Sequence, residues 1–292
     1  MTAMQFFKGH GLGNDYLALE LEELSFQLSP PAVRLLCDRH LGVGSDGILA
    51  RVGTRRADFG LRIFNPDGSE AEKSGNGLRI FAAYLLDRAL VETGSRFTVE
   101  TPGGIVALAI LERTPERVWV EVDMGVASFR SSDVGLSGPD REVQGELLEL
   151  AAGDRLEINT VSLGNPHCVI FEDEVDPETL RRRAPQVSTH PWFARGTNVQ
   201  FARVIEAGAV EAWIWERGAG ETLASGSSAC AVAAVAVRRG LIAEKQVEVR
   251  MPGGTLEVEV RDDWTIVQKG PAEAVFRGEL TGELLRRLEG LG

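Results

Sequence analysis

The sequence of 292 residues predicts an α+β fold of two homologous domains, each a mostly antiparallel sheet wrapped around one central apolar helix. Three observations carry this prediction: short motifs occur twice at a nearly constant offset, many segments alternate apolar and polar residues, and each half contains one mostly apolar helical segment. The length agrees, because a single hydrophobic core stops growing near roughly 250–300 residues. We place the domains at residues 1–127 and 128–292, and the last strand and helix can pack back on the first domain.

The internal repeat rests on pairs of matching motifs. The pairs are Gly13-Asn14 with Gly164-Asn165, Ser74-Gly75 with Ser225-Gly226, and the Pro-Gly-Gly turns at Pro102 and Pro252, at offsets of 151, 151 and 150 residues. In addition, Asn65 and Glu216 each stand nine residues before the serine of their own half. Chance repetition of Gly and Pro turns would scatter these offsets, so we infer the duplication of one domain.

Strands are predicted where apolar and polar residues alternate, because such a segment buries one face of a sheet. In chain order these segments are 4–8, 16–21, 57–64, 96–103, 105–111 and 117–125, and then 168–172, 199–205, 211–217, 247–253, 255–261 and 265–270. The turn-rich sequence between Met124 and Glu142 separates the two groups and predicts the domain boundary.

Helices are predicted at five places. Pro at the start and Gly at the end indicate a helix over 31–42. Segments 75–90 and 227–241 are longer and apolar on most sides, which predicts that the sheet of each half covers its own helix. Segments 177–185 and 282–290 are short and rich in charge, so they are expected on the surface.

Composition excludes several classes of function. Lys and Arg number 31 against 43 Asp and Glu, and the net charge of −12 argues against nucleic-acid binding. No apolar run reaches the roughly 18 residues of a membrane helix, and no signal peptide is recognised, so we expect a cytoplasmic protein without a membrane partner. The cysteines and the four histidines show no disulfide or metal-binding pattern; the cysteines are Cys37, Cys168 and Cys230. The sequence has only four lysines, which leaves few candidates for the Schiff base of a pyridoxal-phosphate enzyme. We expect neither a metal nor a cofactor.

The segment from Gly42 to Gly47 matches the glycine spacing of a dinucleotide-binding loop. It follows a predicted helix and precedes a predicted strand, which is the reverse of the order that a dinucleotide-binding unit requires. We therefore exclude this role.

Each half carries a small-residue turn that leads into its apolar helix, beginning at Ser74 and at Ser225. A helix N-terminus offers unpaired N–H groups and positive potential, and so binds a carboxylate or phosphate. Two such half-sites on opposite faces of one ligand could take a proton from one face of a carbon and return it on the other, as in a racemase or epimerase. The alternative is that both serines are simple helix caps, for which Ser is a favoured residue.

The sequence resembles the diaminopimelate epimerases over nearly its whole length. The motifs that carry the resemblance are FFKGHGLGNDYLALE, GVGSDGILA, RIFNPDGSEAEKSGNGLRIFAAYLL, VSLGNPHCVIF, RGTNVQFARV and WERGAGETLASGSSACAVAA. The resemblance implies interconversion of LL- and meso-diaminopimelate for lysine and peptidoglycan synthesis, without a cofactor. It also implies a homodimer and domains that close around the substrate.

The family works with one catalytic cysteine in each domain, one as thiolate base and the other as thiol acid. In this chain the resemblance places Ser74 and Ser225 at those positions, and Ser228 replaces a glycine of the second motif. A serine hydroxyl is far more basic than a thiol and is neutral at pH 7, so it is a poor base for an α-proton. Two histories fit, an engineered pair or natural divergence, and the additional change at Ser228 favours divergence.

The resemblance also assigns the other site residues one by one. The distal end of the substrate goes to four side-chain amides, which offer donors and acceptors, namely Asn14, Asn65, Asn165 and Asn198. Arg217 would pair with the distal carboxylate and Glu216 with the ammonium. The reacting carboxylate goes to the backbone N–H groups of Gly75, Asn76, Gly226 and Ser227. His167 lies beside the first catalytic position and Glu216 beside the second.

Three functions remain open at this stage. The first is an attenuated amino-acid epimerase or racemase. The second is a one-base lyase or dehydratase on the same scaffold, with His167 or Glu216 as the base. The third is a protein that binds its small-molecule substrate without turnover.

Overall fold

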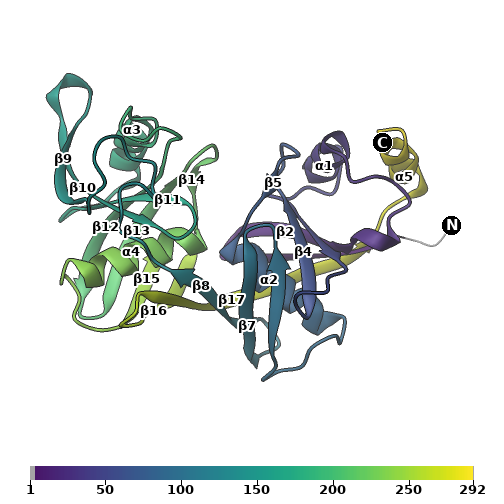
Figure 1. Cartoon of the computed structure of the whole chain (residues 1–292). Coiled ribbons are helices and arrows are strands. Elements are labelled where there is room, and N and C mark those ends of the chain that lie inside the picture. Colours follow the sequence, from purple (N-terminus) through teal and green to yellow (C-terminus); the bar gives the residue numbers. More distant parts are fainter. Residues whose placement is uncertain (1–3, 292) are drawn as a thin grey trace. The chain divides into compact units, whose positions relative to one another are not determined.

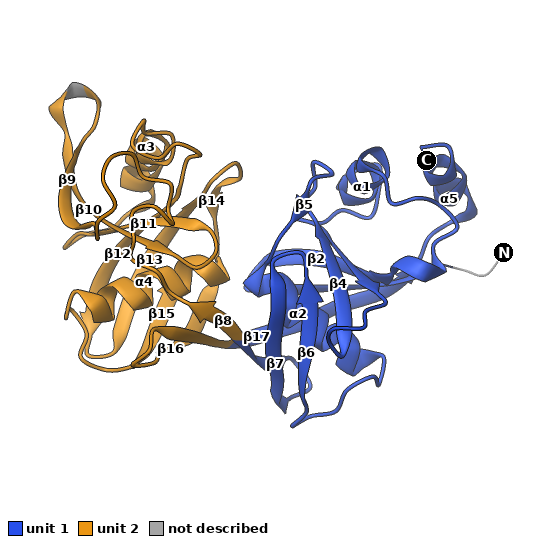
Figure 2. Ribbon diagram, viewed as in Figure 1, with its two compact units in different colours: residues 1–122, 270–292 blue, residues 123–269 orange. Residues whose placement is uncertain are grey.

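The computed structural model describes residues 4–291, and Figure 1 labels most of its elements. The chain divides into two compact units, blue and orange in Figure 2: unit 1 holds Met1–Val122 and Gly270–Gly292, and unit 2 holds Asp123–Lys269. The chain leaves unit 1 inside strand β8 (Val118–Val126) and returns inside strand β17 (Thr265–Glu279). The boundary predicted at residue 127 thus lies inside unit 2, because a continuous strand carries no turn signal where the chain changes units.

Seventeen strands follow one another along the described part of the chain, residues 4–291. Unit 1 contains β1 (Gln5–Gly11), β2 (Asn14–Glu20), β3 (Ile48–Val52), β4 (Phe59–Phe64), β5 (Glu70–Ala71), β6 (Arg96–Thr101), β7 (Gly104–Arg113) and the start of β8. Unit 2 contains β9 (Gln144–Glu149), β10 (Arg155–Ser162), β11 (Pro166–Phe171), β12 (Asn198–Glu206), β13 (Ala209–Glu216), β14 (Gly220–Thr222), β15 (Gln246–Met251), β16 (Gly254–Val260) and the start of β17.

Strand pairing repeats the same order in both units, which is the structural form of the sequence repeat. In unit 1, β1–β2 is antiparallel, β2–β3 parallel, β3–β4 antiparallel, β4–β6 parallel, and β6–β7 and β7–β8 antiparallel. In unit 2, β10–β11 is antiparallel, β11–β12 parallel, β12–β13 antiparallel, β13–β15 parallel, and β15–β16 and β16–β17 antiparallel. The fold is therefore α+β with a mostly antiparallel sheet in each duplicated unit, as predicted.

One apolar helix forms the centre of each unit. Helix α2 (Gly75–Asp87) is buried at every position from Gly75 to Leu86, and helix α4 (Gly226–Arg238) is buried over nearly all of its length. A helix that is apolar all round must be covered on all sides, and the strands of its own unit cover it. The surface helices are α1 (Pro30–Cys37), α3 (Pro177–Ser188) and α5 (Gly282–Glu289), with short 3-10 turns at Leu21–Glu23 and Ala151–Gly153.

Several elements differ from the sequence prediction for identifiable reasons. Helix α1 ends at Cys37 instead of residue 42, because the Asp38 carboxylate accepts the backbone N–H groups of His40 and Leu41 and forms a turn. Strand β3 follows Gly47 as predicted, although its first three residues are all fully buried and show no alternation. Strands β9 and β10 were missed, and β17 runs nine residues beyond the predicted end at 270.

Gly47 marks a position where the unit 1 core accepts no side chain. A Cβ there would lie 2.5 Å from the Phe64 carbonyl oxygen and 2.6 Å from Cε1 of Tyr16. We expect Gly47→Ala to lower the free energy of unfolding by about 2 kcal/mol, the typical cost of overpacking, as measured by urea unfolding. The control is Gly282→Ala, whose Cβ would meet nothing nearer than Arg286 Nη1 at 3.9 Å. Equal stability of the two variants would contradict the prediction.

Candidate functional site

The first predicted half-site is the start of helix α2 in unit 1. We call it the Ser74 cluster, formed by Asn14, Tyr16, Ser74 and Asn76. Ser74 has extended backbone angles (φ −142°, ψ 117°) and caps the helix, because its Oγ accepts the backbone N–H of Gly77 at 3.0 Å. The Tyr16 hydroxyl lies 3.3 Å from the same Oγ. Ser74 is therefore a partly exposed hydroxyl held at a helix N-terminus, where the helix dipole favours negative charge.

The amide pair of this cluster is fixed by its neighbours. Asn76 Nδ2 donates to Asn14 Oδ1 at 3.2 Å, and Asn76 Oδ1 accepts from Arg79 at 2.8 Å. Asn14 Nδ2 donates to Asp46 Oδ2 at 3.1 Å. The guanidinium of Arg79 is itself fully buried and also donates to the Pro271 carbonyl at 3.1 Å. The structure thus brings Asn14, Ser74 and Asn76 together at the start of helix α2.

Asn65 lies at the end of β4, in the turn that leads to β5. Its side chain donates to Ser69 Oγ at 2.9 Å, and its backbone N–H donates to the Ser69 carbonyl at 2.8 Å. Its recorded hydrogen bonds therefore close this turn and do not join it to the Ser74 cluster.

The second predicted half-site is the start of helix α4 in unit 2. We call it the Ser225 cluster, formed by Asn165, His167, Ser225 and Ser227. The resemblance places His167 beside the first catalytic position, whereas its hydrogen bonds are to Asn165 and Gln200 within unit 2. Ser225 occupies the cap position with nearly the same backbone angles as Ser74 (φ −140°, ψ 127°), but its side chain makes no cap hydrogen bond and is only 5% exposed. Asn165 Nδ2 lies 3.5 Å from Ser227 Oγ, so the amide reaches the first turn of the helix.

The two helix starts differ at their third residue. In α2 this residue is Gly77, where an added Cβ would lie 3.2 Å from Ser74 Oγ. In α4 it is Ser228, which is fully buried and whose Oγ accepts from Gln200 at 3.0 Å. The serine in place of glycine therefore coincides with the loss of the cap bond at Ser225.

His167 is buried and neutral. Its Nε2 lies 3.0 Å from Asn165 Oδ1, and its Nδ1 lies 3.1 Å from Gln200 Nε2. Burial, with a smaller contribution from the Arg217 charge, lowers the pKa of His167 to about 3. An imidazole with this pKa is uncharged at neutral pH and is a weak base.

Residues at the edge of unit 2 complete the predicted set. Asn198 Nδ2 donates to the Pro166 carbonyl at 2.9 Å, and Asn198 Oδ1 accepts the backbone N–H of Arg217 at 2.9 Å. The exposed Arg217 guanidinium donates to the Arg195 carbonyl at 2.9 Å. Glu216 ends strand β13 and is half-buried. Asn198 thus ties β11 to the β13 end that carries Glu216 and Arg217.

Some neighbours of the two clusters were missed by sequence reasoning. Tyr16, Asp46 and Gln200 each bind a predicted residue directly. Tyr16 could have been found, because it stands 151 residues before His167 and so occupies the equivalent position of the repeat. Gln200 carries no such signal, since the equivalent position in the first half is Leu49.

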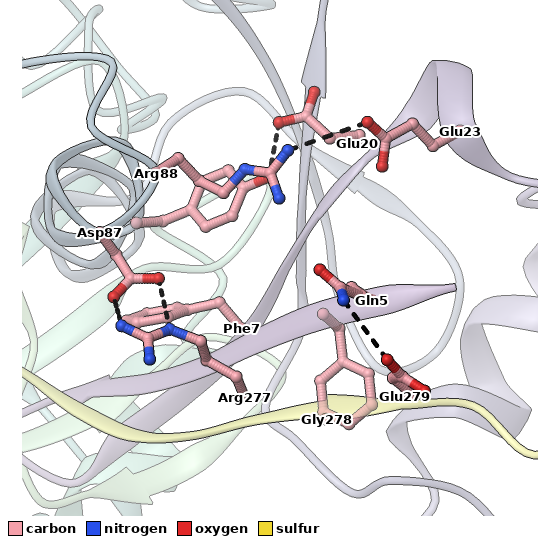
Figure 3. A pocket seen from close by; sticks show the side chains of 11 residues that line it. Gln5, Phe7, Glu20, Glu23, Asp87, Arg88, Arg277, Gly278 and Glu279 are labelled. Atoms are coloured by element: carbon pink, nitrogen blue, oxygen red, sulfur yellow. Dashed lines mark hydrogen bonds and ion pairs between the residues drawn. The ribbon is translucent and has the colours of Figure 1, made fainter. Parts of the chain in front are cut away.

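A separate cavity of about 180 Å³ lies in unit 1, away from the predicted residues (Figure 3). Its wall includes Phe7, Tyr84 and an ion pair between Asp87 and Arg277. The Tyr84 hydroxyl donates to Glu20 at 2.5 Å. The polar groups named here are thus paired with one another, and no residue of either cluster lines the cavity.

Between residues 4 and 291, no group of three or more His, Cys, Asp or Glu side chains is placed to hold a metal ion. In the same part of the chain, no helix is long and apolar enough to cross a membrane.

Comparison with known proteins identifies the family. The family model described as diaminopimelate epimerase matches residues 6–130 and 159–275. A curated relative named diaminopimelate epimerase 2, from Nostoc sp., is 45% identical over 96% of this chain and 97% of its own length. The diaminopimelate epimerase of Pelotomaculum thermopropionicum is 40% identical over 94% and 98%.

A solved structure shows the same fold at low sequence identity. A probable proline racemase from Agrobacterium radiobacter superposes with a TM-score of 0.70 at 15% identity, over 96% of this chain and 93% of its own. The family model and the full-length relatives agree, and the chain belongs to the diaminopimelate epimerase family of isomerases.

Proposed function

We propose that this chain binds diaminopimelate and that the serines at positions 74 and 225 strongly attenuate its interconversion between the LL and meso forms. The observation that carries the proposal is the pair of hydroxyls at equivalent helix N-termini, Ser74 before α2 and Ser225 before α4. The resemblance assigns a thiol to each position. The reaction would supply meso-diaminopimelate for lysine and peptidoglycan synthesis.

The chemistry requires two groups that exchange a proton with one carbon from opposite faces. One must be a base at neutral pH, and the other must be a matching acid. A thiol at a helix N-terminus meets this requirement, because its pKa of about 8.5 is lowered by the dipole. A serine hydroxyl does not ionise at this pH even with the N–H of Gly77 bound to it. General acid–base catalysis contributes about 10²–10⁴-fold, so replacing both groups removes most of the rate.

Binding depends on other groups, which the serines leave in place. The backbone N–H groups of Gly75 and Asn76 in unit 1, and of Gly226 and Ser227 in unit 2, belong to the first turns of their helices. Such groups stabilise a carboxylate. In unit 2 the exposed Arg217 guanidinium offers a fork for the distal carboxylate, with Glu216 adjacent for the ammonium. We therefore expect binding to survive where turnover does not.

The proposal is tested by α-proton exchange. The purified protein is incubated with LL-diaminopimelate in D₂O, and the α-carbon and α-proton signals are followed by NMR. We expect saturable chemical-shift changes on binding and exchange that is slow or undetectable. Rapid exchange with formation of the meso isomer would contradict the attenuation, and the absence of binding would contradict the assigned substrate.

Of the two bases that a one-base elimination could use, His167 and Glu216, the structure argues against His167. The pKa of His167 is lowered to about 3, so this imidazole is too weak a base for an α-proton at neutral pH.

We further propose that the protein is a homodimer. Support comes from strand β17 in unit 1, where Val275 and Phe276 are 51% and 45% exposed next to each other. Adjacent exposed apolar side chains favour association. We expect sedimentation velocity to give a dimer and Phe276→Lys to shift it to monomer, with Leu223→Lys, an exposed leucine of unit 2, as the control. A monomeric wild-type protein would overturn the proposal.

A further inference from the structure

Four side chains of unit 2 form a row of hydrogen bonds that begins in helix α4 and ends in the Ser225 cluster. In order they are Ser228, Gln200, His167 and Asn165. Gln200 Nε2 lies 3.0 Å from Ser228 Oγ and 3.1 Å from His167 Nδ1, and His167 Nε2 lies 3.0 Å from Asn165 Oδ1. Ser228, Gln200 and His167 are all completely buried. Buried groups cannot exchange their hydrogen-bond partners for water, so the direction of each bond in this row is fixed by the neighbouring bonds.

The geometry sets the direction. A glutamine NH₂ carries two hydrogens, which is the number needed to donate both to Ser228 Oγ and to His167 Nδ1. His167 Nδ1 is then an acceptor, and the single proton of the neutral imidazole sits on Nε2 and points at Asn165 Oδ1. Turning the Gln200 amide over would leave an NH₂ group without a partner, whereas the present orientation leaves only Oε1 unpaired. A buried carbonyl tolerates this better than a buried N–H.

The last side chain of the row, Asn165, is thereby held in one orientation. Because Asn165 Oδ1 accepts from His167, its Nδ2 is the end that faces outward, toward Ser227 Oγ at 3.5 Å in the first turn of α4. An amide that presents N–H groups at a helix N-terminus binds carboxylate oxygens, and it repels an ammonium group. The opposite orientation would present a carbonyl oxygen and favour an ammonium.

We propose that Gln200, anchored by Ser228, is a positioning residue that fixes the His167 tautomer and thereby makes Asn165 a hydrogen-bond donor that selects a carboxylate. The carboxylate selection rests on the proposed function, since it takes Asn165 to touch the substrate. The tautomer does not depend on that assumption.

Comparison with unit 1 shows that the row of hydrogen bonds is not a general property of the repeated fold. The positions equivalent to Gln200 and Ser228 are Leu49 and Gly77, which carry no polar side chain. Asn14, equivalent to Asn165, instead has both ends of its amide bound within unit 1, Oδ1 by Asn76 and Nδ2 by Asp46. Only the unit 2 amide is oriented through a buried histidine, so the two half-sites present different groups to a ligand.

The tautomer is measured first, on the ligand-free protein. Long-range ¹H–¹⁵N NMR distinguishes the protonated from the unprotonated ring nitrogen of each histidine, and His167→Asn assigns the His167 signals. We expect protonated Nε2 and unprotonated Nδ1 at pH 7.5. Gln200→Met should shift the Nδ1 resonance further toward that of an unbonded nitrogen. The matched control is Gln268→Met, another fully buried glutamine of unit 2, which should leave it unchanged. A protonated Nδ1 in the wild-type protein would overturn the proposal.

The second measurement is the Kd for LL-diaminopimelate. Removing the Gln200 donor frees the orientation of Asn165, so we expect Gln200→Met to weaken binding about threefold to tenfold, with Gln268→Met near wild type. Asn165→Asp replaces the donor by an acceptor and should weaken binding at least about tenfold. Tighter binding by Asn165→Asp would contradict carboxylate selection. If the wild-type protein does not bind the ligand but shows the expected tautomer, the proposed function fails while the positioning role stands.

Discussion

Cysteine at both positions 74 and 225 is expected to raise the rate of α-proton exchange on LL-diaminopimelate by about 10³-fold or more. The reason is that each serine lacks an ionisable group near neutral pH, and each acid–base partner contributes about 10²–10⁴-fold. The backbone around both positions already has the extended cap geometry that precedes a helix, so a thiol enters with little rearrangement. The measurement is exchange in D₂O together with formation of the meso isomer.

The control for this gain is a thiol at an unrelated helix N-terminus. Thr281 caps α5 by accepting the backbone N–H of Leu284 at 3.3 Å, so Thr281→Cys creates a similar thiol outside both clusters. It should leave exchange unchanged. No gain in the double variant, although it binds the ligand, would show that the scaffold has diverged in more than its two catalytic side chains.

The structure also predicts which of the two introduced thiols ionises first. Position 74 is partly exposed and its side chain receives the N–H of Gly77, whereas position 225 is 5% exposed and receives no cap bond. A hydrogen bond to the charged form lowers a pKa and burial raises it. In the double variant, the thiol at 74 should therefore be the more rapidly alkylated by iodoacetamide at pH 7.

Stability is expected to fall as the pH drops from about 6.5 toward 5 because of His167. In the unfolded chain this histidine has an ordinary pKa near 6.5, whereas burial holds it at about 3 in the folded protein. Between these values the unfolded state binds a proton that the folded state does not, so the free energy of unfolding decreases by up to about 1.4 kcal/mol per pH unit. Above pH 7 the contribution is fully present and no longer changes.

Urea unfolding at pH 7.5 and pH 5.0 tests this prediction. His167→Gln should be less stable than wild type at pH 7.5 and should show a smaller loss between the two pH values. His40→Gln, at an exposed position, is the control and should keep the wild-type loss. The interval stays above pH 4 because the pKa of Asp15, lowered to about 2 by its bonds to Arg39 and Lys8, adds its own dependence at lower pH. An unchanged loss in His167→Gln would contradict the assignment.

The central features were predictable because they leave local signals. Helices α2 and α4 are mostly apolar and follow repeated small-residue turns, so both could be placed within a few residues. The contacts of Asn14 with Asn76, and of Asn165 with Ser227, were not predicted, because the resemblance assigned these residues to the substrate and not to one another.

The remaining features depend on contacts between distant residues. The position of strand β3 after Gly47 was predicted, but its ends were not, because its first three residues are buried and show no alternating pattern. Gln200 lies within an ordinary strand, and only its proximity to His167 and Ser228 gives it a role. Asn65 shows the opposite case, since a matching position in the repeat did not bring it into the Ser74 cluster.

The polypeptide crosses from unit 1 to unit 2 within β8 and returns within β17, and this has a consequence for its synthesis on the ribosome. Unit 2 is one continuous stretch, Asp123–Lys269, whereas unit 1 needs the segment from Gly270 onward, whose residues Glu273–Glu279 pair with β1 at Gln5–His10. On the ribosome, the half that is translated first must therefore wait for the last residues of the chain before its sheet is complete. Strand β1 stays without this partner throughout synthesis of unit 2, and a nascent chain stalled before residue 270 would present that open edge to other proteins.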